Sequence, residues 1–194
     1  MEKKMESNTL YVFDFDDTLV TCDSKVKITK PDGNIEMLSA IEFSDYIYDG
    51  WPEEDKIDHT EFWEYPPNGK WITWTKQRLD YAIDTKHPIF IITGREKLEP
   101  IKKWMINNGQ DIERISFYST MAQPKKEKYR ELLFEAKNSG ISNVVIYEDS
   151  QEALDDMLFV CKEFGIKYSG YKMSKSLISA KDPNSINYVC VEMV

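Results

Sequence analysis

The sequence predicts an α/β fold, a three-layer αβα Rossmann-like arrangement with helices on both faces of a parallel sheet. Short apolar runs recur at 10–13, 88–92, 115–118 and 143–147, each of strand length and rich in β-branched or aromatic residues. Segments with helical spacing lie between these runs. Continuous apolar strands that alternate with helices are typical of a parallel sheet buried on both faces.

The expected helices close on residues that commonly end a helix. Three of them finish on glycine, at 96–109, 125–140 and 150–165. A fourth, TWTKQRLDYAIDTK at 73–86, is expected to lead into the second strand. Weaker strands are expected at 166–171 and 187–191.

One interval is too long for a plain strand–helix–strand unit. Roughly seventy residues or more separate Asp14 from the run at 88–92, whereas such a unit needs about thirty. We therefore expect one domain over the chain, with a core formed by 8–22 and 75–194 and a flap or cap inserted at about 23–74.

The insertion has a pattern of its own. KVKITKPDGNIEML (25–38) alternates around Pro-Asp-Gly and predicts a hairpin, and Ser39 is expected to cap a short helix after it. Nine aromatic residues lie between Phe43 and Trp74. The simplest interpretation is that they form the small core of a cap; the alternative is that some line the mouth of a substrate site.

The composition bears on whether the protein binds nucleic acid, which redox compartment it occupies and whether it enters a membrane. The formal charge of −9 disfavours tight nonspecific binding to nucleic acid, which depends on Lys and Arg neutralising phosphates. Cys22, Cys161 and Cys190 are far apart and odd in number, as expected of reduced thiols in a cytoplasmic protein. No apolar run approaches the length of a membrane span, and the N-terminus is polar, so neither a span nor a signal peptide is expected.

Polar residues follow three of the apolar runs directly. Asp14 and Asp16 follow the first, Thr93 follows the second, and Glu148 and Asp149 follow the fourth. Ligands of open parallel sheets bind beyond the carboxyl ends of the strands, so these groups are expected to converge. Carboxylates this close repel one another, and a metal ion, a reaction or plain solvent at a loop is the usual explanation for such an arrangement. Mg²⁺ suits such a site because it accepts a few carboxylates and bridges to phosphate oxygens.

These motifs resemble those of a known superfamily. DFDDTL (14–19) resembles the DxDx(T/V) signature of the haloacid dehalogenase (HAD) superfamily, an aspartate-nucleophile group dominated by Mg²⁺-dependent phosphatases. FIITGR (90–95), a lysine before the helix at 125–139, and IYED (146–149) are similar to its other motifs, in the same order. The resemblance spans residues 10 to about 155. It implies a HAD-like core with a flap and cap after the first strand.

The resemblance implies a role for each motif residue. Asp14 would attack phosphorus and form an aspartyl-phosphate, while Asp16 would protonate the leaving oxygen and later activate water. Thr93 and nearby backbone N–H groups, such as that of Gly94, would hold the phosphoryl oxygens.

The implied metal ligands are the carboxylate of Asp14, the backbone carbonyl of Asp16, and Asp149, with Glu148 binding directly or through water. Two details depart from the family pattern. Asp17 stands where glycine is frequent, and we expect it in a turn or in solvent. The acidic pair is Glu-Asp where Asp-Asp is common; we favour Asp149 as the direct ligand.

The site lysine is one of a cluster. Lys125, Lys126 and Lys128 all precede Tyr129, and a lysine here would neutralise charge in the transition state. We favour Lys126, which lies three residues before Tyr129 as in family members of this type, with Lys125 as the close alternative. Lys128 is expected on a solvated helix face.

Three further polar residues could have either functional or structural roles. Arg95 is expected to contact substrate, to cap the next helix, or to pair with Glu96 or Glu99. His59 and His87 have no Cys or His partner at metal-binding spacing and are expected to be surface or packing residues.

The expected function is hydrolysis of a phosphomonoester with Mg²⁺. The substrate would be a nucleotide, a small metabolite or a nucleic-acid end; some stretches are similar to small phage- or virus-type members, which weakly favours the nucleotide classes. A phospho-accepting receiver domain is disfavoured because 116–119 reads SFYS and carries no acid. A catalytically silent protein that docks a partner through the aromatic insertion is the other alternative. The sequence leaves open the oligomeric state and whether the insertion closes over the site.

Overall fold

The structure is a computed structural model that describes residues 8–48, 50, 52–121, 123–174 and 190–193. Its main sheet has the strand order β11-β10-β9-β1-β7-β8. The strands are β1 (Thr9–Phe13), β7 (Ile89–Thr93), β8 (Ile115–Ser119), β9 (Asn143–Glu148), β10 (Lys167–Lys172) and β11 (Cys190–Met193).

The first five of these strands along the chain pair in parallel, which confirms the predicted parallel sheet. β11 pairs antiparallel with β10. It begins at Cys190, so residues 187–189 of the strand expected at 187–191 lie outside the described part of the chain.

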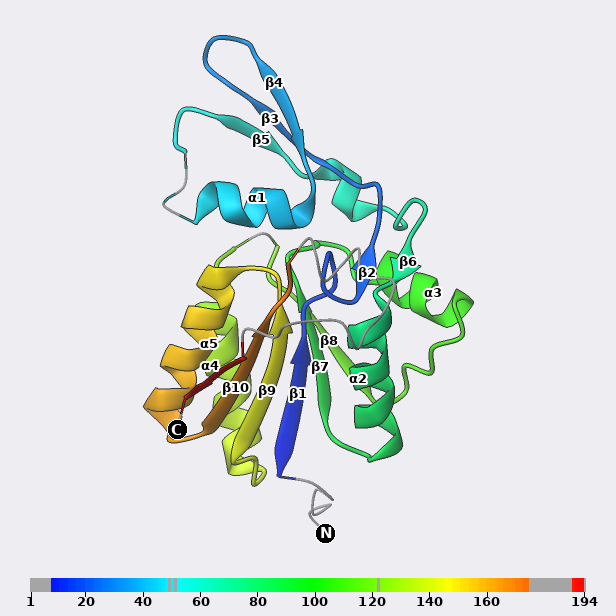
Figure 1. Ribbon diagram of the computed structural model, residues 1–194, viewed down its shortest axis with the longest axis vertical. Helices are drawn as coiled ribbons and strands as arrows, with labels where there is room; N and C mark the ends of the chain where they lie inside the picture. Colours follow the sequence, from blue (N-terminus) through cyan, green and yellow to red (C-terminus); the bar gives the residue numbers. More distant parts are fainter. Residues whose placement is uncertain (1–7, 49, 51, 122, 175–189, 194) are drawn as a thin grey trace.

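Helices cover both faces of the sheet (Figure 1). They are α2 (Thr73–Asp84), α3 (Glu99–Asn107), α4 (Lys126–Asn138) and α5 (Gln151–Phe164). Successive residues of β1 point to opposite faces, as the pleat of a strand requires. Val12 packs with residues of α4 and α5, whereas Phe13 packs with Leu79 of α2 and Ile101 of α3. The expected αβα layering is therefore present.

The helix ends follow the predicted signals. Ser150 caps α5, where its Oγ accepts from the Ala153 N–H at 3.3 Å. The same helix ends at Gly165 in the left-handed conformation, with φ of 64°, which glycine adopts without steric strain. Among the described residues, no helix is long and apolar enough to cross a bilayer.

The segment between β2 (Val20–Thr21) and β6 (Lys70–Trp71), which pair with each other, is called the cap below. It contains a three-stranded antiparallel sheet of order β4-β3-β5 with one α-helix and a 3-10 helix. These elements are β3 (Val26–Thr29), β4 (Ile35–Leu38), α1 (Ala40–Ile47), β5 (Lys56–Asp58) and η1 (Thr60–Trp63). The cap lies over the carboxyl ends of the main strands (Figure 1).

Two predictions within the cap are confirmed. β3 and β4 form the hairpin, with Gly33 at φ of 87° in its turn. Ser39 and Glu42 form a capping box at the start of α1. Phe43 and Phe62 belong to the small core of the cap, as the simplest interpretation of the aromatic residues required.

Not every aromatic residue of the insertion serves the cap. Trp74 packs in the main core, and Trp63 lines the pocket beneath the cap. Trp51 lies outside the described residues.

Candidate active site

The candidate site lies at the carboxyl ends of β1 and β9, where the strand order reverses. From β1 the chain passes through α2 to β7 on one side, and from β9 through α5 to β10 on the other. Adjacent strands whose connections diverge in this way leave a crevice between them. A cavity of about 640 Å³ opens here, between the sheet edge and the cap. Its lining includes all the predicted site residues except Lys126.

Three buried carboxylates converge in this crevice. Asp14 follows β1, and Glu148 and Asp149 stand at the end of β9. One carboxylate oxygen from each lies within 4.8 Å of the others. The three residues are only 6%, 1% and 4% exposed, respectively. The predicted convergence of these acids is therefore found in the structure.

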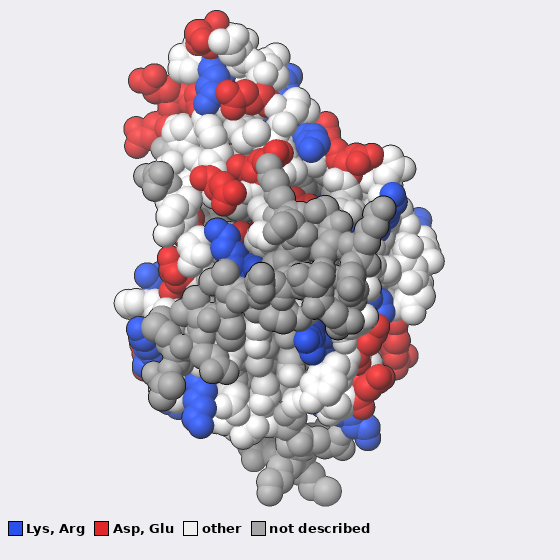
Figure 2. Space-filling view, viewed as in Figure 1, with Lys and Arg blue, Asp and Glu red and all other residues white. Residues whose placement is uncertain are grey.

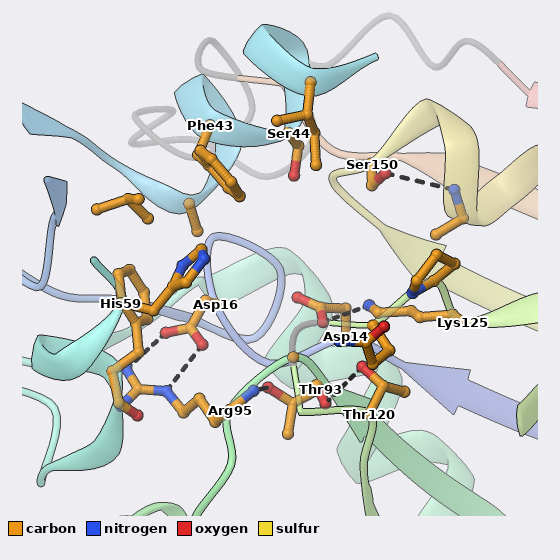
Figure 3. Close-up of a pocket in the computed structure, with 18 of the residues that line it drawn as sticks. Asp14, Asp16, Phe43, Ser44, His59, Thr93, Arg95, Thr120, Lys125 and Ser150 are labelled. Atoms are coloured by element: carbon orange, nitrogen blue, oxygen red, sulfur yellow. Dashed lines mark hydrogen bonds and ion pairs between the residues drawn. The ribbon is translucent and has the colours of Figure 1, made fainter. Parts of the chain in front are cut away.

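A single ammonium group pairs with this cluster. Lys125 Nζ lies 2.7 Å from Asp14 Oδ1 and 2.6 Å from Glu148 Oε2. Figure 3 shows its side chain extending toward Asp14. Burial acts against the charge on Lys125, but the two carboxylates raise its pKa well above the usual value. Lys125 is therefore held as a cation within the cluster.

One lysine does not balance three acids. Burial is the largest cause that raises the pKa of Asp14, and the neighbouring Glu148 adds to it. The pKa of Asp149 is raised well above its usual value by burial and then by Asp14 and Glu148. Uncompensated buried charge is strongly unfavourable. Because a divalent cation would remove this imbalance and prefers carboxylate oxygens, the donor set fits Mg²⁺.

The structure places Lys125 beside the acidic cluster, and not Lys126. Lys126, favoured from the sequence, turns toward α5; its Nζ lies 3.7 Å from Asp156 Oδ1 and 4.1 Å from the centre of the Phe159 ring. Lys125 and Tyr129 are four residues apart, a spacing that places side chains on one face of a helix. Both reach Glu148, since the Tyr129 hydroxyl lies 3.5 Å from its Oε2.

Asp16 is held apart from the acidic cluster by Arg95. Arg95 Nε donates to Asp16 Oδ2 at 2.8 Å, and Nη2 donates to Oδ1 at 2.7 Å. The remaining Nη1 donates to the backbone carbonyls of Phe62 and Glu64 in the cap, at 2.8 and 3.0 Å. Figure 3 shows the Asp16–Arg95 pair beside, and separate from, the Asp14–Lys125 pair.

This arrangement corrects one expectation for Arg95, that it pairs with Glu96 or Glu99. The side chain pairs with Asp16 instead of Glu96 or Glu99, and it is 2% exposed. A guanidinium group can form several hydrogen bonds at fixed angles, which an ammonium group cannot. Arg95 therefore links Asp16 to the cap.

Thr93 and Gly94 form the turn after β7. Thr93 is 1% exposed, and its Oγ1 accepts from the Arg95 N–H at 3.2 Å. Its carbonyl accepts from the Thr120 N–H at 2.9 Å. The turn is thereby fixed against the loop after β8, and both residues line the cavity.

Two contacts between the site and the cap were not predicted. Asp17 has φ of 51° and is 9% exposed, and its Oδ2 accepts from the Ile41 N–H at 3.0 Å. The expected turn is found, but the side chain faces α1 instead of solvent. Ser44 of α1 donates to Asp149 Oδ2 at 3.3 Å. Neither contact has a local sequence signal, because its partners come from different segments.

The histidines pack against aromatic rings, as expected. The rings of His59 and Phe43 lie edge to face with centroids 5.1 Å apart, and burial lowers the pKa of His59. His59 also lines the cavity. The ring of His87 lies 5.0 Å from that of Tyr11, away from the site.

Substituting Arg95 with lysine is expected to lower the free energy of unfolding by about 1–3 kcal/mol, because a single ammonium cannot satisfy both Asp16 and the cap carbonyls. Urea unfolding followed by tryptophan fluorescence measures this change. The matched control is Arg130→Lys, a surface arginine paired with Glu127 and Glu163, for which we expect a much smaller change in the free energy of unfolding because solvent screens its ion pairs. Equal losses in the two variants would contradict the structural role of Arg95.

Comparisons of the chain with family models, curated proteins and solved structures gave no match. Function is therefore inferred from the residues of the site and their geometry.

Proposed function

We propose that this chain is a Mg²⁺-dependent phosphohydrolase of the HAD type, which cleaves a phosphomonoester through an aspartyl-phosphate on Asp14. The observation that supports this most is the buried cluster at the sheet edge. There Asp14 lies beside the Lys125 ammonium. A carboxylate oxygen of Asp14 is within 4.8 Å of carboxylate oxygens of Glu148 and Asp149. With Mg²⁺ bound among these acids, the Asp14 carboxylate beside the Lys125 ammonium would suit attack on an anionic substrate, because the two cations would offset the negative charge of the cluster.

Two displacements at phosphorus make up the proposed reaction. An oxygen of Asp14 bonds to phosphorus as the ester bond breaks, and a water molecule then bonds to phosphorus as the Asp14–phosphorus bond breaks. Lys125 balances charge on Asp14 and on the transferring phosphoryl group. Mg²⁺, held by Asp14, Asp149 and Glu148 with the Asp16 carbonyl, would supply further positive charge to the phosphoryl oxygens.

Asp16 is the proposed acid and base. It would take up a proton from solvent before the first step, give it to the leaving oxygen, and take a proton from the attacking water in the second step, which restores it for the next cycle. Both of its oxygens accept from Arg95, which fixes the orientation of its carboxylate in the cavity. The hydroxyl of Thr93 and the Gly94 N–H are proposed to hold the phosphoryl oxygens.

The test is phosphate release from a substrate panel, with and without Mg²⁺. The panel contains an aryl phosphate, nucleoside monophosphates, sugar phosphates and oligonucleotides with a 3′- or 5′-phosphate. We expect release with Mg²⁺, loss of release with EDTA, and recovery when Mg²⁺ is added back. Release that EDTA leaves unchanged, or no release from the whole panel, would contradict the proposal.

A further inference from the structure

The cavity above Asp14 has an apolar wall. The cap supplies most of this wall, through Phe43, Ile47, Ile57, Phe62 and Trp63. Phe43 and Phe62 are also part of the cap core, which fixes their positions. Sites that take small organic ligands have cavities of about 300–1,000 Å³ lined mainly by apolar groups. The volume of about 640 Å³ falls in this range.

Eight carboxylates among the described residues also line the cavity. Beyond the four carboxylates already described, four more line the cavity: Asp58, Glu96, Glu152 and Asp156. The cap as a whole carries exposed acids, and Figure 2 shows Asp and Glu gathered over it. Those on the described part of the cap include Asp32, Glu36, Glu53, Glu54, Asp58, Glu61 and Glu64.

Cations in the cavity are few and already engaged. Among the described lining residues, Arg95 and Lys125 are the only Lys or Arg side chains. Arg95 uses its donors on Asp16 and on two cap carbonyls. Lys125 lies between Asp14 and Glu148. A second phosphate on a substrate would therefore face carboxylates without a free cation among the described lining residues.

The cap is also held close to the site. Ser44 donates to Asp149, and Arg95 donates to the carbonyls of Phe62 and Glu64. The apolar wall is thereby kept above the sheet edge that carries Asp14. The cavity that these contacts border has the volume of a small-ligand site.

Building on the proposed function, we infer that the substrate is a small phosphomonoester with one phosphate and an apolar or aromatic remainder that has no further negative charge. The phosphate would lie at Asp14 and Lys125, and the remainder would lie against Phe43, Ile57 and Trp63. Repulsion from the acidic lining would disfavour bisphosphates and phosphorylated nucleic-acid ends, since like charges placed together are a common source of specificity.

A matched aryl series tests this inference by turnover. The substrates are phenyl phosphate, 4-carboxyphenyl phosphate and 1,4-phenylene bisphosphate, with a 5′-phosphorylated oligonucleotide. We expect kcat/KM to be highest for phenyl phosphate and at least about tenfold lower for the bisphosphate and the oligonucleotide. Equal or faster turnover of the bisphosphate or the oligonucleotide would overturn the inference.

Charge removal in the lining provides a second measurement. In the double variant Asp58→Asn, Glu152→Gln, the ratio of kcat/KM for bisphosphate to that for phenyl phosphate should rise about three- to tenfold. The control Glu113→Gln removes an exposed acid outside the lining and should leave this ratio unchanged. An unchanged ratio in the double variant would contradict repulsion as the cause.

Binding of non-hydrolysable ligands tests the inferred ligand class independently of the proposed reaction. Benzylphosphonate and 1,4-xylylene bisphosphonate resemble the two aryl phosphates but contain carbon–phosphorus bonds that phosphoester hydrolysis does not cleave. Calorimetry of the unaltered protein with Mg²⁺ should show tighter binding of the monophosphonate. If the panel releases no phosphate but this order holds, the reaction is wrong and the ligand class stands. If phosphate is released but the bisphosphonate binds equally or more tightly, or the monophosphonate does not bind, the ligand class is wrong.

Discussion

Asp14→Asn is expected to reduce phosphate release by more than about 10⁴-fold, because the amide cannot form the aspartyl-phosphate of the proposed reaction. Asparagine has nearly the same shape as aspartate, so the buried position at the end of β1 stays filled. The measurement is single-turnover and steady-state phosphate release with Mg²⁺ and an aryl phosphate. Release within tenfold of the unaltered protein would exclude Asp14 as the nucleophile.

The same variant should be more stable than the unaltered protein when EDTA is present. Burial raises the pKa of Asp14 to about 8. Between the unfolded pKa and this value, the Asp14 carboxyl is protonated in the folded state and ionised in the unfolded state. The stability contributed by this group therefore falls as the pH rises from about 4 to about 8. Removing the carboxyl group removes that unfavourable effect, and the melting temperature at neutral pH should rise.

Asp58→Asn is the control of opposite sign. Hydrogen bonds from Thr60 lower the pKa of Asp58, so its ionised form favours the folded state above the unfolded pKa. The melting temperature of this variant should be unchanged or lower. A fall in melting temperature for Asp14→Asn, equal to or larger than that for Asp58→Asn, would contradict the electrostatic account of the cluster.

Lys125→Met is expected to lower kcat/KM by about 10²–10³-fold, whereas Lys126→Met should stay within about twofold of the unaltered protein. Methionine keeps the apolar length of lysine but not its charge. The two positions are adjacent in sequence, yet Lys125 pairs with Asp14 and Glu148, and Lys126 pairs with Asp156. Steady-state kinetics on an aryl phosphate with Mg²⁺ measures the difference.

The two lysine variants should also differ in stability. Loss of Lys125 leaves Asp14 and Glu148 buried without their cation, which is expected to lower the free energy of unfolding by about 3–5 kcal/mol in EDTA. The Lys126 side chain is 37% exposed, and its loss should change that free energy by less than about 1 kcal/mol. Added Mg²⁺ should recover part of the stability of Lys125→Met. Equal effects of the two substitutions on rate and stability would contradict the assignment of Lys125 as the site lysine.

Features that depend on local pattern could be predicted from the sequence. Continuous apolar runs predicted the parallel strands, since a strand buried on both faces needs apolar residues at successive positions. The Pro-Asp-Gly turn predicted the β3–β4 hairpin, and Ser39 predicted the start of α1. The convergence of Asp14 with Glu148 and Asp149 followed from one topological rule for parallel sheets.

Features that depend on contacts between distant segments could not be predicted in the same way. The Arg95–Asp16 pair joins residues 79 positions apart, and the Ser44–Asp149 contact joins residues 105 positions apart. The choice between Lys125 and Lys126 depended on how α4 is rotated about its axis. That rotation is set by packing against α5 and the sheet. A spacing taken from related proteins could therefore not predict which lysine faces the acids.

The two-sided bonding of Arg95 has a thermodynamic consequence. One guanidinium contacts the carboxylate of Asp16 and the carbonyls of Phe62 and Glu64, so the position of the cap and the orientation of the acid share a coupling free energy. Such coupling is reciprocal. A ligand that draws the cap down also holds Asp16 in place, and a change that reorients Asp16 loosens the cap by the same amount. If the proposed function holds, closure of the cap on substrate and the orientation of Asp16 for proton transfer would be two effects of one equilibrium.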